Sequence, residues 1–418
     1  MNLKARFSLI GLGMILFLIT TPLLVLYARG FKFDYKTGTI TKTGAMVVKT
    51  DPDKAEIYLD GALVGQSPSN IRFLLPKDYE VEIKKDGYQT WSKRLNVASQ
   101  FVTWVNSFRE YIALFLSEPK LTENFITNAY SVSKNGNEIV FLQNDQYKLL
   151  NTKNGEVSNL GSNENVSFPE IGTANLQWTN ADKVFESLQV NHSAAVLSLI
   201  KQARYLESNG EQMIILTSTN ELYQYNLSTF SLIDNHVITA SLAFDGIWYL
   251  QNQILKHKEF GSSSIRIVAS DLPPFTTATI DRVNNKIFIV LDQTLYVLND
   301  KLETIYTPVT YTNWDEAAGR LVFGNVNEIQ IYNPTEKNID LILRALEPIG
   351  NVQLNNETGY VFYSQKDNIF AIELDGRNRR NIFQIADNLG TNPYFKVAEN
   401  GKIISVFDSE SAKFYTIR

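Results

Sequence analysis

The side chains that could perform chemistry in this sequence are few and widely spaced. There are three histidines, His192, His236 and His257, and no cysteine. The intervals of 44 residues (192 to 236) and 21 residues (236 to 257) match no short zinc spacing. Without thiols the chain has no disulfide, thiolate metal site or cysteine nucleophile. No metal site and no cofactor are predicted.

Charged clusters fall where turns are expected. We attribute two acidic pairs, Asp281 with Asp292 and Asp315 with Glu316, to chance among many acidic turn residues. The run "RNRR", residues 377–380, indicates a solvated loop rather than a carboxylate clamp. No G-x-S-x-G elbow, repeated Asp box or EF-hand spacing occurs. The sequence therefore predicts no catalytic residue, and the residues that bind a ligand stay unknown.

The stretch "IYLDGALVGQSP", residues 57–68, holds a carboxylate, two glycines and a serine. A phosphate-binding loop is excluded because Gly61 and Gly65 are four apart and no lysine follows the second. Asp60-Gly61 instead fits a two-residue type I′ hairpin turn, which needs positive φ at both central positions. We interpret the stretch as two tight turns.

Three tryptophans beyond residue 126, Trp178, Trp248 and Trp314, could stack on sugars or anchor a protein partner. All three lie on expected repeat strands, which favours packing in a core.

Composition fits a folded protein of more than one unit. The 418 residues are 44% hydrophobic and 12% aromatic, which is ample for packed cores. The net charge of −5 and the mixed signs provide no basic surface, so nucleic acid is not an expected partner.

The amino-terminal segment, residues 1–30, is predicted to be a cytoplasmic tail and a transmembrane anchor. Residues 8–27 carry no charge and as a helix would rise about 30 Å, the thickness of the hydrocarbon core. A cleaved signal peptide is the alternative, but its apolar region is usually shorter and "YARGF" is a poor cleavage site.

The charges that flank this segment disagree about orientation. Lys4 and Arg6 argue for a cytoplasmic amino terminus, whereas Arg29, Lys32 and Lys36 argue for the reverse. Because a short tail precedes the span and everything else follows it, we expect a single-pass protein with an extracellular body.

After a linker, residues 31–43, the segment 44–98 reads as short strands separated by turns, with alternation clearest in "YEVEIKK". "DPDKAEIYLDGALVGQSP" and "GYQTW" resemble the PEGA domain, a small sandwich-like β module of bacterial and archaeal surface proteins. "PDKA", residues 52–55, departs from the family tetrapeptide. The resemblance implies an extracellular adhesion or spacing role and carries over no catalytic residue.

Residues 126–418 repeat a polar turn followed by an apolar strand eight times, at intervals of 29 to 45 residues. Each unit reads as four strands, and the period is that of a propeller blade. "SVSKNGNEIVF" resembles the repeats of the TolB-like and WD40-like β-propeller families. We expect an all-β chain with eight blades, or seven because the second unit is irregular.

The last repeat ends after its second apolar strand, which would leave a sheet edge exposed. Within the connector, residues 99–125, the strand-like segment 110–116 belongs to no complete unit. We predict that it closes the ring by pairing with the carboxy-terminal blade.

Together these features predict a membrane-anchored extracellular binding or scaffold protein rather than an enzyme. One propeller face would contact cell-wall polysaccharide or an envelope protein. The alternatives are a propeller-type hydrolase that acts on glycan or peptide at an unrecognised site, and a sensor whose body faces the cytoplasm.

Overall fold

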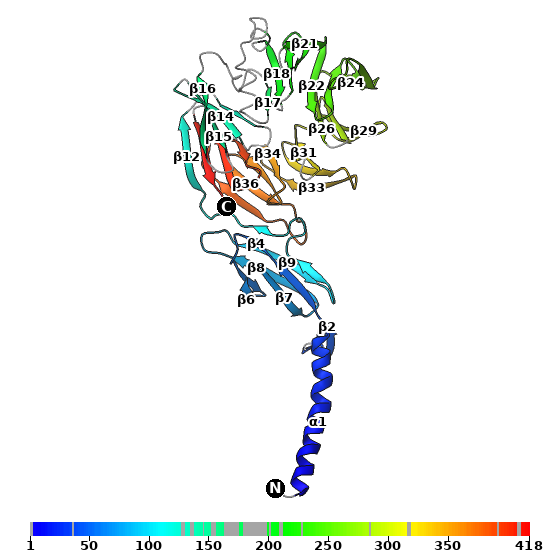
Figure 1. Ribbon diagram of the computed structural model, residues 1–418, viewed down its shortest axis with the longest axis vertical. Coiled ribbons are helices and arrows are strands. Elements are labelled where there is room, and N and C mark those ends of the chain that lie inside the picture. The colour runs from blue at the N-terminus through cyan, green and yellow to red at the C-terminus, as the bar shows by residue number, and fades with distance from the viewer. Residues whose placement is uncertain are drawn as a thin grey trace. The chain divides into compact units, whose positions relative to one another are not determined.

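The computed structural model describes one helix and a succession of small β-sheets (Figure 1). It describes residues 3–418 except 36, 127–129, 134–137, 145, 152–155, 163–174, 179–198, 200–201, 209–211, 227–228, 284–285, 316–318, 391–392 and 408–410.

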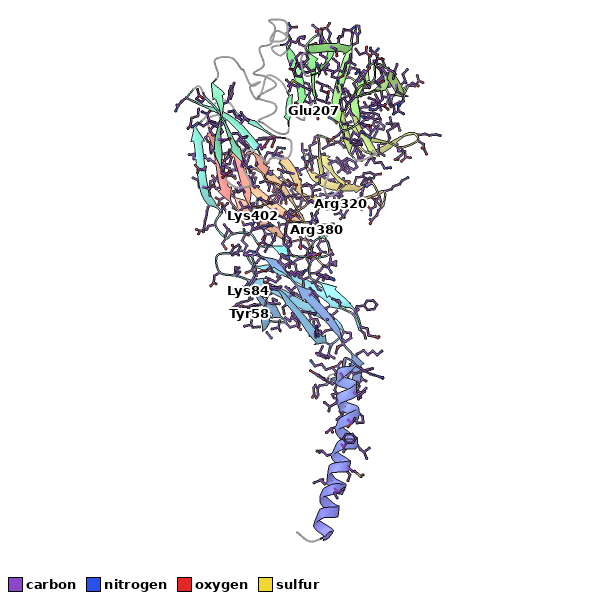
Figure 2. All side chains as sticks on the ribbon, viewed as in Figure 1. Tyr58, Lys84, Glu207, Arg320, Arg380 and Lys402 are labelled. Atoms are coloured by element: carbon purple, nitrogen blue, oxygen red, sulfur yellow. The ribbon has the colours of Figure 1, made fainter. Side chains whose placement is uncertain are left out.

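The helix α1 (Leu3–Ala28) contains the expected apolar segment and Pro22. Its 19-residue stretch Ile10–Ala28 is long and apolar enough to cross a membrane, and no part of it is buried in protein. Figure 2 shows side chains projecting outward along it. Apart from Tyr27, whose ring stacks on Phe73 with 4.8 Å between centroids, the apolar side chains of Ile10–Ala28 are therefore available to lipid, as a membrane-spanning helix requires.

The chain forms two compact units. Unit 1 consists of Met1–Glu118, Glu373–Phe383 and Arg418, and unit 2 of Pro119–Ile372 and Gln384–Ile417. The chain thus leaves unit 1 at Glu118 and returns to it twice.

The β-strands of unit 1 form two main sheets and two short pairs. The sheets have the orders β10-β3-β7 and β6-β5-β8-β9, and the pairs are β1-β2 and β11-β4. The strands are β1 (Phe31–Asp34), β2 (Thr39–Lys42), β3 (Gly44–Val48), β4 (Thr50–Asp51), β5 (Glu56–Leu59), β6 (Ala62–Gln66), β7 (Ser69–Leu74), β8 (Lys77–Lys84), β9 (Trp91–Val97), β10 (Val102–Trp104) and β11 (Ile112–Ala113). Alternate residues of β8 and β9 point inward, and Val81, Ile83 and Trp91 are fully buried.

The stretch 57–68 forms the hairpin that the sequence predicts. Asp60 and Gly61, with φ of 50° and 81°, connect β5 to β6. The Asp60 carboxylate also accepts the backbone N–H of Glu80 at 3.0 Å and binds Lys77. The aspartate therefore supports the turn conformation and ties it to β8.

Unit 2 is a series of small antiparallel sheets, as a propeller requires. The strands are β12 (Lys120–Ile126), β13 (Tyr130–Val132), β14 (Glu138–Gln143), β15 (Gln146–Asn151), β16 (Val157–Ser162), β17 (Asn175–Trp178), β18 (Ala203–Ser208), β19 (Met213–Thr217), β20 (Leu222–Asn226), β21 (Thr229–Asp234), β22 (Val237–Ala243), β23 (Gly246–Gln251), β24 (Ile254–Glu259), β25 (Ile265–Ala269), β26 (Ala278–Val283), β27 (Lys286–Leu291), β28 (Thr294–Leu298), β29 (Leu302–Tyr306), β30 (Tyr311–Asp315), β31 (Arg320–Asn325), β32 (Glu328–Asn333), β33 (Asn338–Arg344), β34 (Ile349–Asn355), β35 (Tyr360–Gln365), β36 (Asn368–Glu373), β37 (Ile382–Ala386), β38 (Tyr394–Val397), β39 (Ile403–Phe407) and β40 (Ser411–Thr416).

Neighbouring sheets pack through shared apolar clusters. One cluster joins Leu250 and Leu255 to Ile287 and Ile289 of the next sheet. Another joins Phe288 to Phe323 of the sheet after that. This sequential packing of four-stranded sheets is the construction of a β-propeller.

The described residues form seven sheets of this kind, one of which has five strands because β17 joins β18 in parallel. Most of the second repeat unit, residues 179–198 and 200–201, lies outside the described residues. The count of eight blades therefore stays a prediction.

The ring closes with a different segment from the one predicted. β12 (Lys120–Ile126) pairs antiparallel with β40, and Figure 1 shows it beside the red carboxy-terminal strand. The segment 110–116 instead contributes β11 to unit 1, where Ile112 and Ala113 pair in parallel with Thr50 and Asp51. The exposed edge was correctly inferred, but the strand that fills it lies about ten residues later.

A close approach inside unit 2 makes Gly324 of β31 hard to replace. The Tyr311 hydroxyl reaches across to the Glu328 carbonyl, with 2.6 Å between the oxygens. A Cβ on Gly324 would lie 2.5 Å from that hydroxyl oxygen and closer still to the carbonyl oxygen. We expect Gly324→Ala to lower the free energy of unfolding by about 1–3 kcal/mol, a typical overpacking cost.

Urea denaturation of the full chain in detergent checks this value. Val326→Ala, at a half-exposed position in the same hairpin, is the control. Equal stability of the two variants would show that the hairpin relaxes around the added methyl group.

Candidate functional site

The two histidines that the structure describes, His236 and His257, do not come together. His257 of β24 is 2% exposed and stacks on Trp248, with 4.2 Å between ring centroids. Burial lowers the pKa of His257, so the ring is neutral and serves as a core aromatic residue. His236 is exposed in the turn before β22, and His192 lies outside the described residues.

The tryptophan prediction is confirmed where the structure describes the side chain. Trp248 is 4% exposed and belongs to an apolar cluster. Trp178 and Trp314 lie on strands, as expected, but their side chains are outside the described part of the chain.

Asp281 and Asp292 belong to different ends of one hairpin. Asp281 faces Phe288, whereas Asp292 follows the far end of β27, about 13 Å further along the strand. Hydrogen bonds from Thr277 and Thr276 hold the pKa of Asp292 at about 2. An open cavity of about 700 Å³ at this turn is lined by Asp292, Thr276, Thr277 and their neighbours. Because Thr276 and Thr277 already donate hydrogen bonds to this carboxylate, we infer that Asp292 stabilises the turn.

The other acidic pair is only partly described. Asp315 ends β30, and Glu316 lies outside the described residues. Within the described ranges no three His, Asp or Glu side chains are placed to share a metal ion.

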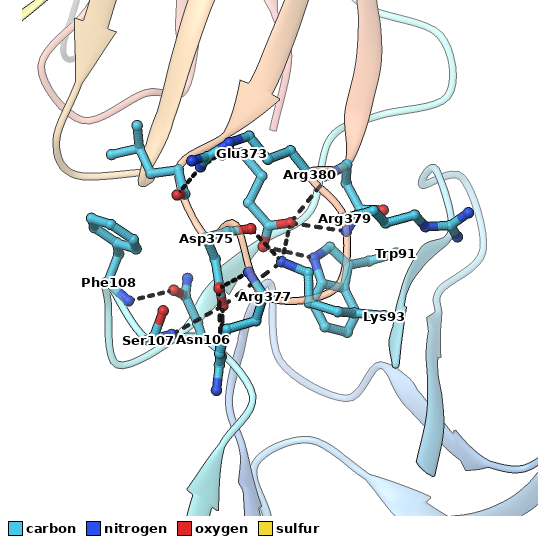
Figure 3. A network of polar contacts seen from close by, with 12 residues as sticks. Trp91, Lys93, Asn106, Ser107, Phe108, Glu373, Asp375, Arg377, Arg379 and Arg380 are labelled. Carbon is cyan, nitrogen blue, oxygen red and sulfur yellow. Dashed lines mark hydrogen bonds and ion pairs between the residues drawn. The ribbon is translucent and has the colours of Figure 1, made fainter. Parts of the chain in front are cut away.

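Among the described residues, a cluster of buried charge lies in unit 1, around Lys93 of β9 (Figure 3). Lys93 is 0% exposed, and its Nζ lies 2.8 Å from Glu373 Oε2 and 3.7 Å from Asp375 Oδ2. The same nitrogen donates to the Asp375 backbone carbonyl at 2.7 Å. Both carboxylates come from the segment Glu373–Phe383, which connects β36 to β37.

Glu373 is satisfied by several donors. The Trp91 indole Nε1 donates to Glu373 Oε1 at 3.2 Å, and the Asn381 side-chain amide donates to Oε2 at 3.0 Å. Glu373 is only 2% exposed, so these partners and Lys93 replace the water that a free carboxylate would bind.

Asp375 is held by Arg377. The Arg377 Nη2 donates to Asp375 Oδ2 at 2.6 Å, and its Nε is 3.0 Å from each carboxylate oxygen. The remaining donors of Arg377 reach the carbonyls of Trp104 and Val105 at 3.1 and 2.9 Å. One guanidinium therefore joins the loop carboxylate to the end of β10.

The "RNRR" run is thus a turn, as predicted, but it is not simply solvated. Arg380 donates to the carbonyls of Glu373 and Leu374. Arg379 is exposed and donates to Ser92 Oγ at 2.7 Å. Arg377 binds the buried Asp375 two residues before it in the chain, which is an ion pair within the protein and not the clamp for a ligand carboxylate that the sequence argument disfavoured.

The pKa values of the two buried carboxyl groups shift in opposite directions. Burial raises the pKa of Glu373, and the attraction of Lys93 only partly opposes this. Burial also acts to raise the pKa of Asp375, but the Arg377 hydrogen bonds and the Lys93 charge outweigh it, so that pKa is lowered. A carboxyl pair with divided pKa values is typical of acid–base catalysis. Here both groups are nearly inaccessible, at 2% and 1% exposure, so the pair fixes the loop and meets no substrate.

One signal for this network is present in the sequence. In "WSKRLNV" the alternation places Lys93 in phase with Trp91, Leu95 and Val97, which is the core face. A lysine on that face requires a buried acidic partner. Its partners could not be identified because they lie about 280 residues away along the chain.

The raised pKa of Glu373 gives a pH prediction. A carboxyl group whose pKa is higher in the folded than in the unfolded state stabilises the folded state most at pH values below its unfolded pKa. This stabilisation is lost as the pH rises through the folded pKa. Relative to Glu373→Gln, which cannot ionise, the natural chain should become less stable as pH rises above the ordinary glutamate value.

Urea denaturation of both chains from about pH 4 to pH 8 measures this difference. Glu82→Gln, a half-exposed site on β8, is the control. If the two chains differed in free energy of unfolding by the same amount at every pH, Glu373 would not be a buried group that ionises with a raised pKa.

Comparison with known proteins agrees with this architecture. Residues 43–110 match the PEGA domain, and the chain matches no curated protein. The match extends past residue 98 because β10 pairs with β3 and belongs to the same unit. Kluyveromyces lactis Hsv2 is a similar solved structure, with 8% identity, TM-score 0.44, and coverage of 68% of this chain and 90% of that chain.

The WD40 β-propeller domain of Doa1 is another similar structure, with 11% identity, TM-score 0.43, and coverage of 72% of this chain and 98% of that chain. Similarity at this level says nothing about function. The chain carries a PEGA domain at residues 43–110, followed by a β-propeller built from four-stranded sheets.

Proposed function

We propose that this chain is a single-pass membrane protein that holds a PEGA domain and a propeller outside the cell as a non-catalytic binding scaffold. The observation that carries the proposal is α1, whose apolar stretch Ile10–Ala28 is entirely unburied. A soluble protein would not leave 19 consecutive uncharged and mostly apolar helical residues in water. A PEGA domain is typical of extracellular proteins, which supports an exported body.

The catalytic alternative has little support. The two carboxyl groups whose pKa values shift in opposite directions, those of Glu373 and Asp375, are buried inside unit 1. They lie at no opening that glycan or peptide could enter, so a hydrolase would need a different site.

The exposed apolar side chains of unit 2 favour an envelope protein over cell-wall polysaccharide as the partner. Sugar-binding surfaces use aromatic rings, but only Phe244 and Tyr394 are exposed aromatic residues among those described in unit 2. The other exposed apolar residues are aliphatic. They include Leu232, Ile265, Ile267, Ile339 and Leu341, which lie on the outermost strands β21, β25 and β33. Such edges also offer backbone groups for pairing with another chain.

Crosslinking on intact cells tests this choice, because the chain has no natural cysteine. A thiol-directed photocrosslinker at Ile339→Cys should give one adduct of defined mass, which Leu341→Glu should abolish. The control is Asn338→Cys, exposed on the opposite face of the same strand. Pelleting of the full detergent-solubilised chain with purified sacculi, without that adduct, would favour polysaccharide instead.

A further inference from the structure

The β1–β2 hairpin directly follows the membrane helix and is fixed to its end. The Gly30 N–H donates to the Tyr27 carbonyl at 2.9 Å, with φ of +82° at Gly30, which closes the helix. The Gly30 carbonyl then accepts both the N–H and the hydroxyl of Thr43, at 2.8 and 2.7 Å. The first and last residues of the hairpin are therefore held where the helix ends.

One face of this hairpin is apolar and exposed. Phe33 faces Ile40 across the pair, and they are 45% and 52% exposed. Tyr35 is 89% exposed and packs edge-on against Phe33, with 5.1 Å between ring centroids. Phe31 lies on the same side, with the Lys42 Nζ 5.5 Å from its ring centroid. No described part of the protein covers this face.

Basic residues lie on both faces of the hairpin. Lys42 is on the apolar face, where its Nζ also donates to Gln100 Oε1 at 3.0 Å, and Lys32 is on the opposite face, with its Nζ 3.5 Å from the Phe73 carbonyl oxygen. Arg29, Lys32 and Lys42 are all exposed, against one acidic residue of the hairpin, Asp34. Asp34 already accepts a hydrogen bond from the Thr37 hydroxyl at 2.9 Å. Aromatic rings, lysine and arginine next to a membrane helix are typical of protein segments that lie among lipid headgroups.

The chain length leaves the hairpin no room to move away from the bilayer. Only two residues separate Ala28 from Phe31, which corresponds to at most about 10 Å of extended chain. The headgroup region on each side of the hydrocarbon core is about 5–8 Å thick. The hairpin therefore begins within or directly against that region if α1 spans the membrane.

We propose that the β1–β2 hairpin is a lipid-binding element: its Phe31, Phe33, Tyr35 and Ile40 side chains insert among phospholipid headgroups, and Arg29, Lys32 and Lys42 bind lipid phosphates. The proposal rests on the membrane anchorage proposed above. The positive charges after the span conflicted with the amino-terminal charges as a signal of orientation. The proposal explains them instead by a role in lipid binding.

The test uses single-cysteine variants of the full chain in nanodiscs of phosphatidylglycerol and phosphatidylcholine, each labelled with an environment-sensitive fluorophore. Ile40→Cys reports the apolar face, and Thr39→Cys reports the opposite face of the same strand. Leu18→Cys reports the middle of α1. We expect a shallow nitroxide-labelled lipid to quench the Ile40 label strongly and the Thr39 label weakly, and a deep nitroxide to quench the Leu18 label.

Equal, weak quenching of the Ile40 and Thr39 labels, with the Leu18 label still quenched, would overturn the hairpin proposal and leave the membrane anchor intact. An unquenched Leu18 label would overturn the anchor and the hairpin proposal together. The two failures are therefore distinguishable.

Lysine neutralisation tests the phosphate contacts. In phosphatidylglycerol nanodiscs, Lys32→Gln and Lys42→Gln should each shift the inserted fraction of the Ile40 label about fivefold toward water. In nanodiscs of phosphatidylcholine alone, where choline offsets the charge of each phosphate, the shift should be smaller. No shift from either substitution in phosphatidylglycerol nanodiscs would overturn the phosphate contacts.

Discussion

Replacing Lys93 by methionine should lower the free energy of unfolding of unit 1 by about 3–5 kcal/mol, the usual cost of removing one partner from a buried ion pair. Methionine approximates the length and flexibility of lysine, so the cavity left is small. The loss arises because the carboxyl groups of Glu373 and Asp375, 2% and 1% exposed, would lose the ammonium group that compensates their burial. Hydrogen exchange of the β8 and β9 amides in the full chain reports this local stability.

Two further variants separate charge from packing. Lys93→Met with Glu373→Gln should recover most of the loss, because glutamine can still accept from Trp91 and the excess negative charge is gone. Lys84→Met, on the neighbouring strand β8, removes a half-exposed lysine paired with Glu82 (Figure 2). It should cost less than about 1 kcal/mol, as surface pairs do. If Lys93→Met cost no more than Lys84→Met, the buried network would not be a stabilising element of unit 1.

A cysteine pair at Asn124 and Lys413 should form a disulfide and stabilise unit 2 strongly. These residues face each other across the β12–β40 pair that closes the ring. Facing residues of an antiparallel pair have Cβ atoms about 4.5–5.5 Å apart, close enough to bridge with a small adjustment. The bridge would enclose about 290 residues, for which the chain-entropy relation gives about 5–6 kcal/mol. The melting temperature of the oxidised and reduced forms measures the gain.

The matched control places both cysteines on the same strands but out of register. Lys120 faces Thr416, so Lys120→Cys lies about 10 Å along the strand from Lys413→Cys. Oxidation should leave that pair uncrosslinked, because it is beyond disulfide reach. Crosslinking of the control as efficiently as the Asn124 pair would contradict the β12–β40 register.

What the sequence predicted correctly were features encoded over short distances. Asp60-Gly61 specifies its own turn because both residues adopt positive φ, and the charge-free run 8–27 specifies its own helix. The four-stranded units follow from alternation and turn residues within about 40 positions.

Features that depend on distant segments were missed or misplaced. The sequence argument chose 110–116 as the partner of the last strand, whereas the structure uses 120–126, and the choice depends on how far the chain must travel after unit 1. Likewise, Arg377 looked solvated in the sequence because two of its acceptors, the Trp104 and Val105 carbonyls, lie in a different part of the chain. Local patterns show that an edge or a charge needs a partner, but tertiary packing selects which one.

The central claim, a membrane anchor with an exported body, is tested most directly by cysteine labelling of intact cells. The chain has no natural cysteine, so Asn2→Cys and Leu346→Cys each give one reporter. Leu346 is fully exposed in unit 2. With a maleimide that cannot cross the cytoplasmic membrane, the account predicts labelling of Leu346→Cys in intact cells and of Asn2→Cys only after lysis. Labelling of Asn2→Cys in intact cells, with Leu346→Cys protected until lysis, would contradict it and place the body in the cytoplasm.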